Sequence, residues 1–199
     1  TVNADETTYL NWSLTYAPKE YITLQPGSEG KDSIVMERYP DANYVSFYRL
    51  YIGYSSINNA KYRAYLQFDL GTVPEDARII NADLKIYQCA LEGSGSFTAG
   101  LYQVTSDWEE NLITWNTQPT SSSEAEALST INTWTVTTWR ILGINNLVKG
   151  WLNESITNNG ILLKALDEGS TNILVGFHSS DDTIDTSKCP KLVIDYYIP

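Results

Sequence analysis

Short segments in which apolar and polar residues alternate occur along most of this chain. These segments are rich in Val, Ile, Leu, Tyr and Phe, and clusters of Gly, Pro, Asn, Asp and Ser separate them. Alternation with a period of two is typical of a strand with one face in a core, and regularly spaced strands of this kind favour a sandwich or a barrel. We therefore predict an all-β fold with strands at residues 33–39, 48–54, 62–70, 79–89, 98–105, 160–166, 173–179 and 191–197.

The alternation also predicts which side chains face the core. In the second of these strands Leu50 and Ile52 face inward, so Arg49 and Tyr51 face outward. In the other strands the predicted inward rows are Ala64, Leu66, Phe68 and Leu70, and then Leu192, Ile194 and Tyr196, while Arg63, Tyr65 and Gln67 face outward.

One segment has a helical period instead. Apolar residues recur three and four positions apart from Ile144 to Trp151, and Asn145 is suited to cap a helix. We expect one short helix near 145–152. Residues 120–130 are polar and predict a long surface loop.

The chain length is that of one all-β domain, so we expect a single module over residues 1–199. Its first 25 residues contain several aromatic side chains, which predicts an N-terminal strand extension ahead of a core at 26–198.

Composition narrows the range of partners. The chain has 14 Tyr and 6 Trp against 4 Phe, and its formal net charge is −11. Tyr and Trp suit half-buried sheet faces and wet binding surfaces. Nucleic acids and anionic membranes require clustered Lys and Arg, so the charge disfavours both. No apolar run approaches the roughly 20 residues that span a bilayer, so we expect no membrane insertion.

The two cysteines leave two alternatives open. Cys89 ends one predicted strand and Cys189 begins the last one. If these strands are antiparallel neighbours, the thiols lie at the same end of the pair and could form a disulfide. Otherwise they are two separate buried thiols.

Residues 102–119, with the sequence YQVTSDWEENLITWNTQP, contain the most distinctive motifs, Asp-Trp-x-Glu followed by Thr-Trp-Asn-x-Gln-Pro. Further motifs occur in a fixed order around them. These are Gly30-x-Asp32-Ser33, Asn43-Tyr44, Leu50–Gly53, Tyr62-Arg63, Leu66–Leu70, Val73-Pro74, Ala82-x-Leu84-x-Ile86-Tyr87, Leu147–Leu152, Asn159–Lys164, Phe177-x-Ser179-Ser180 and Pro190–Ile194.

In this order the motifs resemble the DNRLRE-type domains, named from a disaggregatase of methane-producing archaea and grouped partly with carbohydrate-binding module family 96. The resemblance covers residues 26–198. It implies a jelly-roll-like antiparallel β-sandwich that accompanies catalytic or adhesive domains of the same parent chain in large secreted proteins. It therefore implies an extracellular or cell-surface location.

The resemblance also implies that some members bind acidic polysaccharides such as alginate, while many members have no known ligand. This chain departs from the family at Val45, where glycine is usual, at Gln67, where a basic residue is common, and at Gly143, where aspartate is frequent. Because Gln67 is predicted to face outward, where a ligand could contact it, this departure weakens the inference that the chain shares the ligand preference of its family.

An enzyme has little support in the residues. The single histidine, His178, precedes Ser179 and Ser180, but no Gly-x-Ser-x-Gly elbow is present. With 24 acidic residues, a pair of carboxylates at the spacing of a glycosidase arises by chance, and basic partners for a lyase tyrosine are few. Of the neighbours Glu109 and Glu110, we expect one to be structural and the other solvated.

No cofactor is required by these patterns, and zinc is disfavoured by one His and two distant Cys. Calcium prefers carboxylate and carbonyl oxygens in turns. Asp181, Asp182 and Asp185, or Asp41 and Asn43, could supply them, so a structural calcium ion is an open expectation.

A sugar site needs an exposed aromatic platform with hydrogen-bonding groups beside it. We predict such a site on two neighbouring strands, formed by Tyr48, Arg49, Tyr51, Tyr62, Tyr65 and Gln67. Ordinary cross-strand pairing on a sheet surface is the alternative for these residues, and Arg63 is assigned a structural role. We assign Trp108, Trp115 and Trp151 to the core, whereas Trp12, Trp134 and Trp139 could reach a surface.

The leading hypothesis is a non-catalytic carbohydrate-binding module that tethers a larger secreted or cell-surface microbial protein to polysaccharide. The low content of basic residues favours a neutral glycan. The alternative is a structural or adhesion spacer that contacts protein and has no sugar site. A lyase or hydrolase is the third hypothesis.

Overall fold

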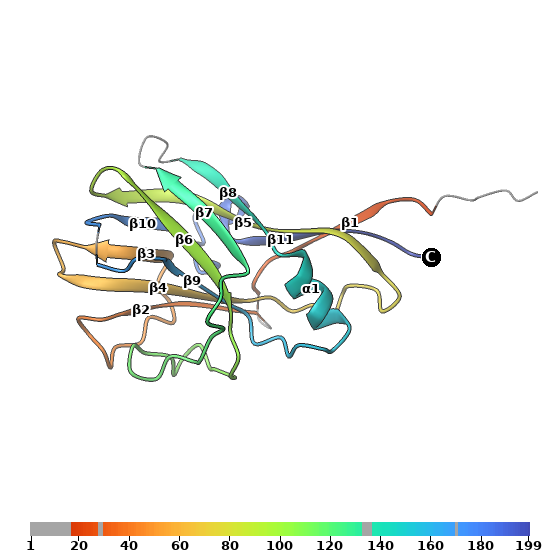
Figure 1. The fold of residues 1–199 in the computed structure, drawn as a ribbon, viewed down its shortest axis with the longest axis horizontal. Helices are drawn as coiled ribbons and strands as arrows, with labels where there is room; N and C mark the ends of the chain where they lie inside the picture. The colour runs from red at the N-terminus through yellow and green to blue at the C-terminus, as the bar shows by residue number, and fades with distance from the viewer. Residues whose placement is uncertain (1–16, 28–29, 133–136, 170) are drawn as a thin grey trace, which may run out of the picture.

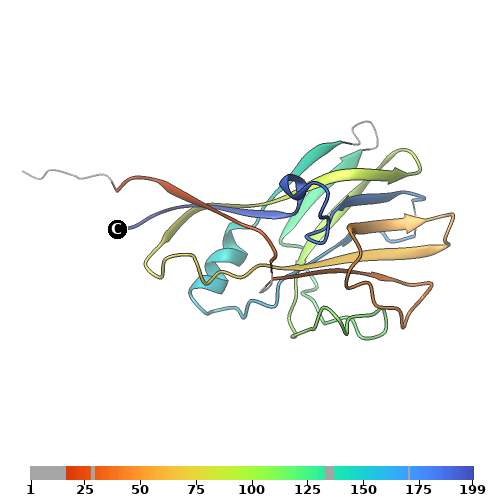
Figure 2. The same ribbon diagram turned by 180° about the vertical axis from the view of Figure 1, so that it is seen from behind.

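The strands of this protein form one continuous antiparallel network that curls into two facing layers (Figures 1 and 2). The computed structural model describes residues 17–27, 30–132, 137–169 and 171–199. Its elements are β1 (Glu20–Leu24), β2 (Lys31–Met36), β3 (Arg49–Ser55), β4 (Ala60–Gln67), β5 (Arg78–Glu92), β6 (Ser96–Gln103), β7 (Ala127–Asn132), β8 (Thr138–Gly143), α1 (Asn145–Leu152), β9 (Ile161–Ala165), β10 (Leu174–His178), η1 (Thr186–Lys188) and β11 (Lys191–Tyr197).

The strand order is β1-β11-β5-β10-β3-β4-β9-β6-β7, with β2 added to β4 and β8 added to β5. All of these pairs are antiparallel. The predicted all-β antiparallel sandwich with one short helix is confirmed. β5 pairs with β11 along the first part of its length and with β10 along the last part. This long strand therefore joins the β1-β11 pair to β10 and β3.

The main core lies between the layers and contains the rows that alternation predicted. Leu50, Ile52, Leu66, Leu192 and Ile194 are all buried in it. Burial of side chains of this size contributes about 1.5–3 kcal/mol each, which makes this core the main source of stability.

A second, smaller core lies on the other face of β4. It contains Val35, Tyr65, Tyr102, Val104, Trp108, Ile113 and Leu162. The prediction that Tyr65 faces outward to solvent is therefore wrong, because its side chain is 0% exposed. Alternation placed Tyr65 correctly on the face opposite Leu66, but the segment that follows β6 covers that face with Trp108 and Ile113.

The helix α1 has the predicted bounds, and Trp151 packs beneath it in the main core. Asn145 does not cap it: Ile144 precedes the helix, and the side-chain oxygen of Asn145 accepts a hydrogen bond from the backbone N–H of Ala82. Among the described residues no helix is long and apolar enough to cross a membrane.

Two elements differ from expectation. The predicted loop at 120–130 runs into β7, which pairs with β6, and β8 was not predicted at all. β7 lies at the end of the strand order and has one neighbour there. It buries Ile131 in the main core but leaves Leu128 exposed. At the N-terminus, β1 pairs with β11, and the two strands extend together in Figure 2. Trp12 and Trp134 lie outside the described residues.

Candidate functional site

The structure separates the six residues predicted to bind sugar. Tyr48, Arg49 and Tyr51 lie together at the start of β3, and Tyr51 contacts Tyr62 of β4. Tyr65 is enclosed in the second core. The amide nitrogen of Gln67 donates to the carbonyl of Asn158 at 2.8 Å, away from the other predicted residues.

Four of the six predicted residues lie in or beside a groove of about 630 Å³ between the connection from β2 to β3 and strands β3, β4 and β5. We call it the aromatic groove. Tyr48 adjoins it, and its aromatic and polar lining is Tyr39, Tyr44, Phe47, Arg49, Tyr51, Asn58, Tyr62 and Glu92. Tyr39, Tyr44 and Phe47 were missed by the sequence analysis. The available signal was the spacing of aromatic residues between 39 and 51.

The rings of the groove form a continuous row. Centroid distances are 6.0 Å from Tyr44 to Phe47, 6.1 Å from Phe47 to Tyr51 and 5.9 Å from Tyr51 to Tyr62. Tyr48 joins the row at 5.5 Å from Phe47. Tyr48 is 48% exposed and Phe47 is 36% exposed, while Tyr62 is buried at 4%. The row therefore begins at the exposed ring of Tyr48 and ends at the buried ring of Tyr62, which belongs to the main core.

A glycine supports the centre of this row. Gly176 of β10 pairs with Tyr51 in the sheet. A Cβ atom at Gly176 would lie 2.6 Å from the Tyr51 ring and 2.9 Å from Ala90. Glycine at this position therefore leaves room for the Tyr51 ring beside β10.

The connection that carries the exposed rings is anchored by Asn43. Its amide nitrogen donates to the carbonyls of Glu110 and Ile113, both at 2.8 Å, and its oxygen accepts from the N–H of Val45 at 3.0 Å. The distinctive motifs at 102–119 therefore anchor the connection that carries the exposed rings, although they do not line the groove.

Polar groups in the groove are already oriented. Arg49 donates to the hydroxyl of Tyr51 at 3.3 Å, its guanidinium lies 5.1 Å from the Tyr48 ring, and the hydrogen bond to Tyr51 raises the pKa of Arg49. Glu92 accepts hydrogen bonds from Ser55 and Ser56. Burial raises the pKa of Tyr62, so its phenol stays neutral. The arrangement can stack a sugar ring and bind hydroxyl groups.

Three carboxylates from distant motifs meet near the start of β2. One oxygen from each of Asp32, Glu110 and Asp181 lies within 4.8 Å of the others. Asp32 is buried and accepts hydrogen bonds from the Ser179 hydroxyl at 2.9 Å and the Ser180 N–H at 2.7 Å. Burial raises the pKa of Asp32 to about 6. Carboxylate oxygens at this spacing are the donors that calcium prefers.

The residues that the sequence suggested as calcium ligands do not form one cluster in the structure. Asp181 belongs to this carboxylate cluster, whereas Asp182 accepts hydrogen bonds from Ile184 and His178. Asp41 accepts from Asn116, and Asn43 is engaged as described above. Calcium stays a prediction, now for Asp32, Glu110 and Asp181. Of the neighbouring glutamates, Glu110 is the structural one and Glu109 is exposed.

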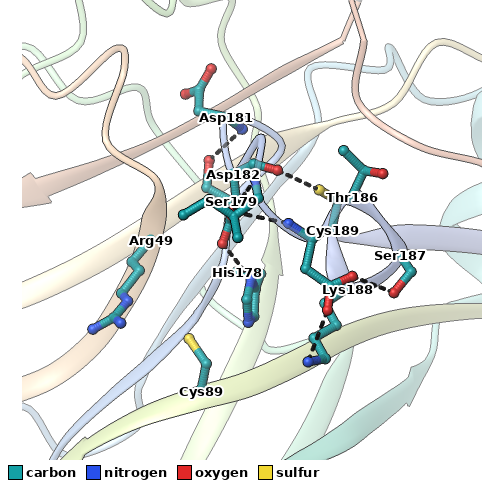
Figure 3. A network of polar contacts seen from close by, with 12 residues as sticks. Arg49, Cys89, His178, Ser179, Asp181, Asp182, Thr186, Ser187, Lys188 and Cys189 are labelled. Atoms are coloured by element: carbon teal, nitrogen blue, oxygen red, sulfur yellow. Dashed lines mark hydrogen bonds and ion pairs between the residues drawn. The ribbon is translucent and has the colours of Figure 1, made fainter.

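His178 ends β10 beside a polar network (Figure 3). Its Nδ1 lies 2.6 Å from Asp182, while the Ser179 hydroxyl donates to Asp32. His178 and Ser179 thus have different hydrogen-bond partners. Both cysteines are free thiols: the Cys89 sulfur contacts the carbonyl of Gly176 and the Cys189 sulfur contacts that of Asp182. Of the two open alternatives, the structure has separate thiols.

Comparison with known proteins identifies one matching family. The sequence model of carbohydrate-binding module family 96 matches residues 23–196, which include every strand except the start of β1 and the end of β11. Among curated proteins, none matches the chain.

Proposed function

The chain belongs to carbohydrate-binding module family 96, and from this premise we propose that it is a non-catalytic module that binds polysaccharide in the aromatic groove. The proposal includes its context, a larger secreted or cell-surface microbial protein that the module tethers to its polysaccharide. The observation that carries the proposal is the row of rings from Phe47 through Tyr51 to Tyr62, supported from below by Gly176.

The charges in the groove support a neutral glycan. Its lining contains one cation, Arg49, and one carboxylate, Glu92. Arg49 is turned onto Tyr48 and Tyr51, and Glu92 is occupied by the turn after β3. Aromatic rings offer the apolar faces of a sugar a surface at low entropic cost. Neither charged group has to be paired by a charge on the ligand.

Replacement of Tyr51 by alanine is expected to weaken polysaccharide binding by about tenfold or more, because the central ring of the row is lost. The measurement is affinity electrophoresis of the purified protein against neutral and acidic polysaccharides. Tyr197→Ala is a matched control, since this tyrosine is 38% exposed and lies on β11, outside the groove.

A second variant tests the geometry without removing a ring. Gly176→Ala keeps Tyr51 but its Cβ forces the ring to move, so binding should weaken while the row keeps its composition. If wild type binds and both Tyr51→Ala and Gly176→Ala bind equally well, the groove is not the site. If wild type binds no polysaccharide of the panel, the alternative applies: a spacer whose exposed rings contact a neighbouring domain.

A further inference from the structure

The aromatic groove has an apolar part in addition to its row of rings. The rest of its lining consists of Ile34, Met36, Ala90, Leu91 and Leu174. Ile34, Met36 and Leu174 are buried members of the main core, so this part forms the inner side of the groove. The groove volume of about 630 Å³ lies within the range of about 300–1,000 Å³ that is typical of small-molecule sites. A sugar held by the rings therefore has apolar side chains within its site.

This inner side discriminates between the substituents of a sugar. A hydroxyl group placed against Met36 or Leu174 would lose its hydrogen bonds to water and gain none, which costs free energy. A methyl group in the same place is removed from water, which is favourable. The inner side of the groove therefore favours a glycan whose substituents end in methyl groups.

The hydroxyl of Tyr44 lies beside this inner side and has a weak partner. Within the described ranges of the chain, its hydrogen-bond partner is the thioether sulfur of Met36, at 4.0 Å. A thioether is a weak acceptor. The hydroxyl of Tyr62, by contrast, already takes part in a hydrogen bond of ordinary length, from the side-chain amide of Asn58 at 2.9 Å. The Tyr44 donor is therefore open to a stronger acceptor on a ligand.

The position of the Tyr44 hydroxyl is fixed by the fold. The ring of Tyr44 packs edge-on against Phe47 at 6.0 Å, and the preceding residue, Asn43, is anchored by two hydrogen bonds from its amide nitrogen. Burial raises the pKa of Tyr44, so its phenol keeps the proton that it would donate. A donor held in this way is preorganised for a ligand acceptor.

A hydroxyl donor next to an apolar surface matches an acetyl group, in which one carbon carries both a carbonyl oxygen and a methyl group. We propose that the aromatic groove selects glycans that carry acetyl groups, with Tyr44 donating to the acetyl carbonyl oxygen and Met36 contacting the acetyl methyl. The inference rests on the proposed function and names the ligand class of that same groove. O-acetyl esters and N-acetyl amides share this chemistry, and the experiment separates them.

Affinity electrophoresis with two pairs of uncharged polymers tests the proposal. Acetylated glucomannan and its alkali-deacetylated form differ in O-acetyl esters, while glycol chitin and hydroxyethylcellulose differ in the N-acetyl group on the sugar ring. Wild type should bind the acetylated member of at least one pair about tenfold more tightly, because one hydrogen bond and one buried methyl group are added. The pair that shows the preference identifies the ester or the amide as the ligand group.

Two variants place the acetyl group in the groove. Tyr44→Phe keeps the ring and removes only the hydroxyl, so it should lower the ratio of binding between the two members of the preferred pair by about fivefold. Met36→Gln replaces the thioether with an amide of similar size and should lower the same ratio. A general change in the shape of the groove would weaken the binding of both members alike and would leave the ratio unaltered.

Tyr197→Phe is the matched control, because it removes a hydroxyl from β11, outside the groove, and should keep the wild-type ratio. Melting temperatures verify that every variant is folded.

Three results would overturn the proposal. Equal binding of wild type to both members of each pair would remove the acetyl preference but leave the proposed function standing. A wild-type ratio in both Tyr44→Phe and Met36→Gln would show that the acetyl group is not bound at this place. No retardation of wild type by any of the four polymers would also contradict it, and retardation by another uncharged polysaccharide would in that case preserve the proposed function.

Discussion

Replacement of Arg63 by alanine is expected to lower the free energy of unfolding by about 3 kcal/mol, because it leaves a largely buried carboxylate without its partner. Arg63 donates to both carboxylate oxygens of Glu168, at 2.8 and 2.7 Å, and the side chains are 22% and 13% exposed. It also donates to Gln118 at 2.8 Å, and its guanidinium lies 4.6 Å from the Trp115 ring. The Arg63 side chain thus joins β4 to the connection between β6 and β7, which carries Gln118, and to the connection between β9 and β10, which carries Glu168.

Urea unfolding at neutral pH measures this change, and the same strand provides a control. Lys61 pairs with Glu37 at 3.0 Å, but these side chains are 32% and 38% exposed. Lys61→Ala should therefore cost less than about 1 kcal/mol. The double variant Arg63→Met/Glu168→Met should recover most of the loss, since no charge is left unpaired. An equal cost for Arg63→Ala and Lys61→Ala would show that the buried network contributes little.

The stability of the metal-free protein is expected to fall as pH rises from about 4 to about 6, by an amount on the order of 3 kcal/mol from Asp32. Burial raises the pKa of Asp32 from 3.8 to about 6, so the folded state holds this proton more tightly than the unfolded state. The stabilisation is complete below the unfolded pKa and is lost as pH rises through the folded one. Burial also raises the pKa of Glu110 and Asp181, which adds to the same trend.

Urea unfolding in EDTA across this pH range provides the measurement, and Asp32→Asn isolates the contribution of Asp32. The difference in slope between wild type and Asp32→Asn should vanish above about pH 6. A flat wild-type profile, parallel to that of Asp32→Asn, would contradict the prediction. If calcium binds the carboxylate cluster as proposed, its addition near neutral pH should raise the melting temperature of wild type and leave Asp32→Asn unchanged.

Local periodicity was enough to predict most of the fold. Leu50 and Ile52 alternate with polar residues, and Leu147 and Trp151 recur at helical spacing, so each pattern identifies its element and its buried face. β7 and β8 lacked such a pattern. Each of these strands carries a buried apolar residue, Ile131 or Leu142, and an exposed one, Leu128 or Ile141, so the apolar positions do not mark a single face.

The candidate site was predictable only in part. Tyr48, Arg49 and Tyr51 adjoin in sequence and stay together in space. The assignment of Tyr65 failed because alternation tells which face of a strand a residue occupies, but not which distant segment covers that face. Tyr39, Tyr44 and Phe47 lie on an irregular connection, where no periodicity indicates direction.

By itself, the sequence determined the class of fold, the helix, the inward rows and the family resemblance, because each depends on residues a few positions apart. The tertiary structure alone decided which aromatic rings form a groove, which apolar side chains complete its lining and which acids converge on Asp32. Those relations depend on strand order and register, which bring residues more than a hundred positions apart into contact, as Asp32 and Ser179 are. No local pattern encodes such a pairing, since it results from the packing of the whole chain.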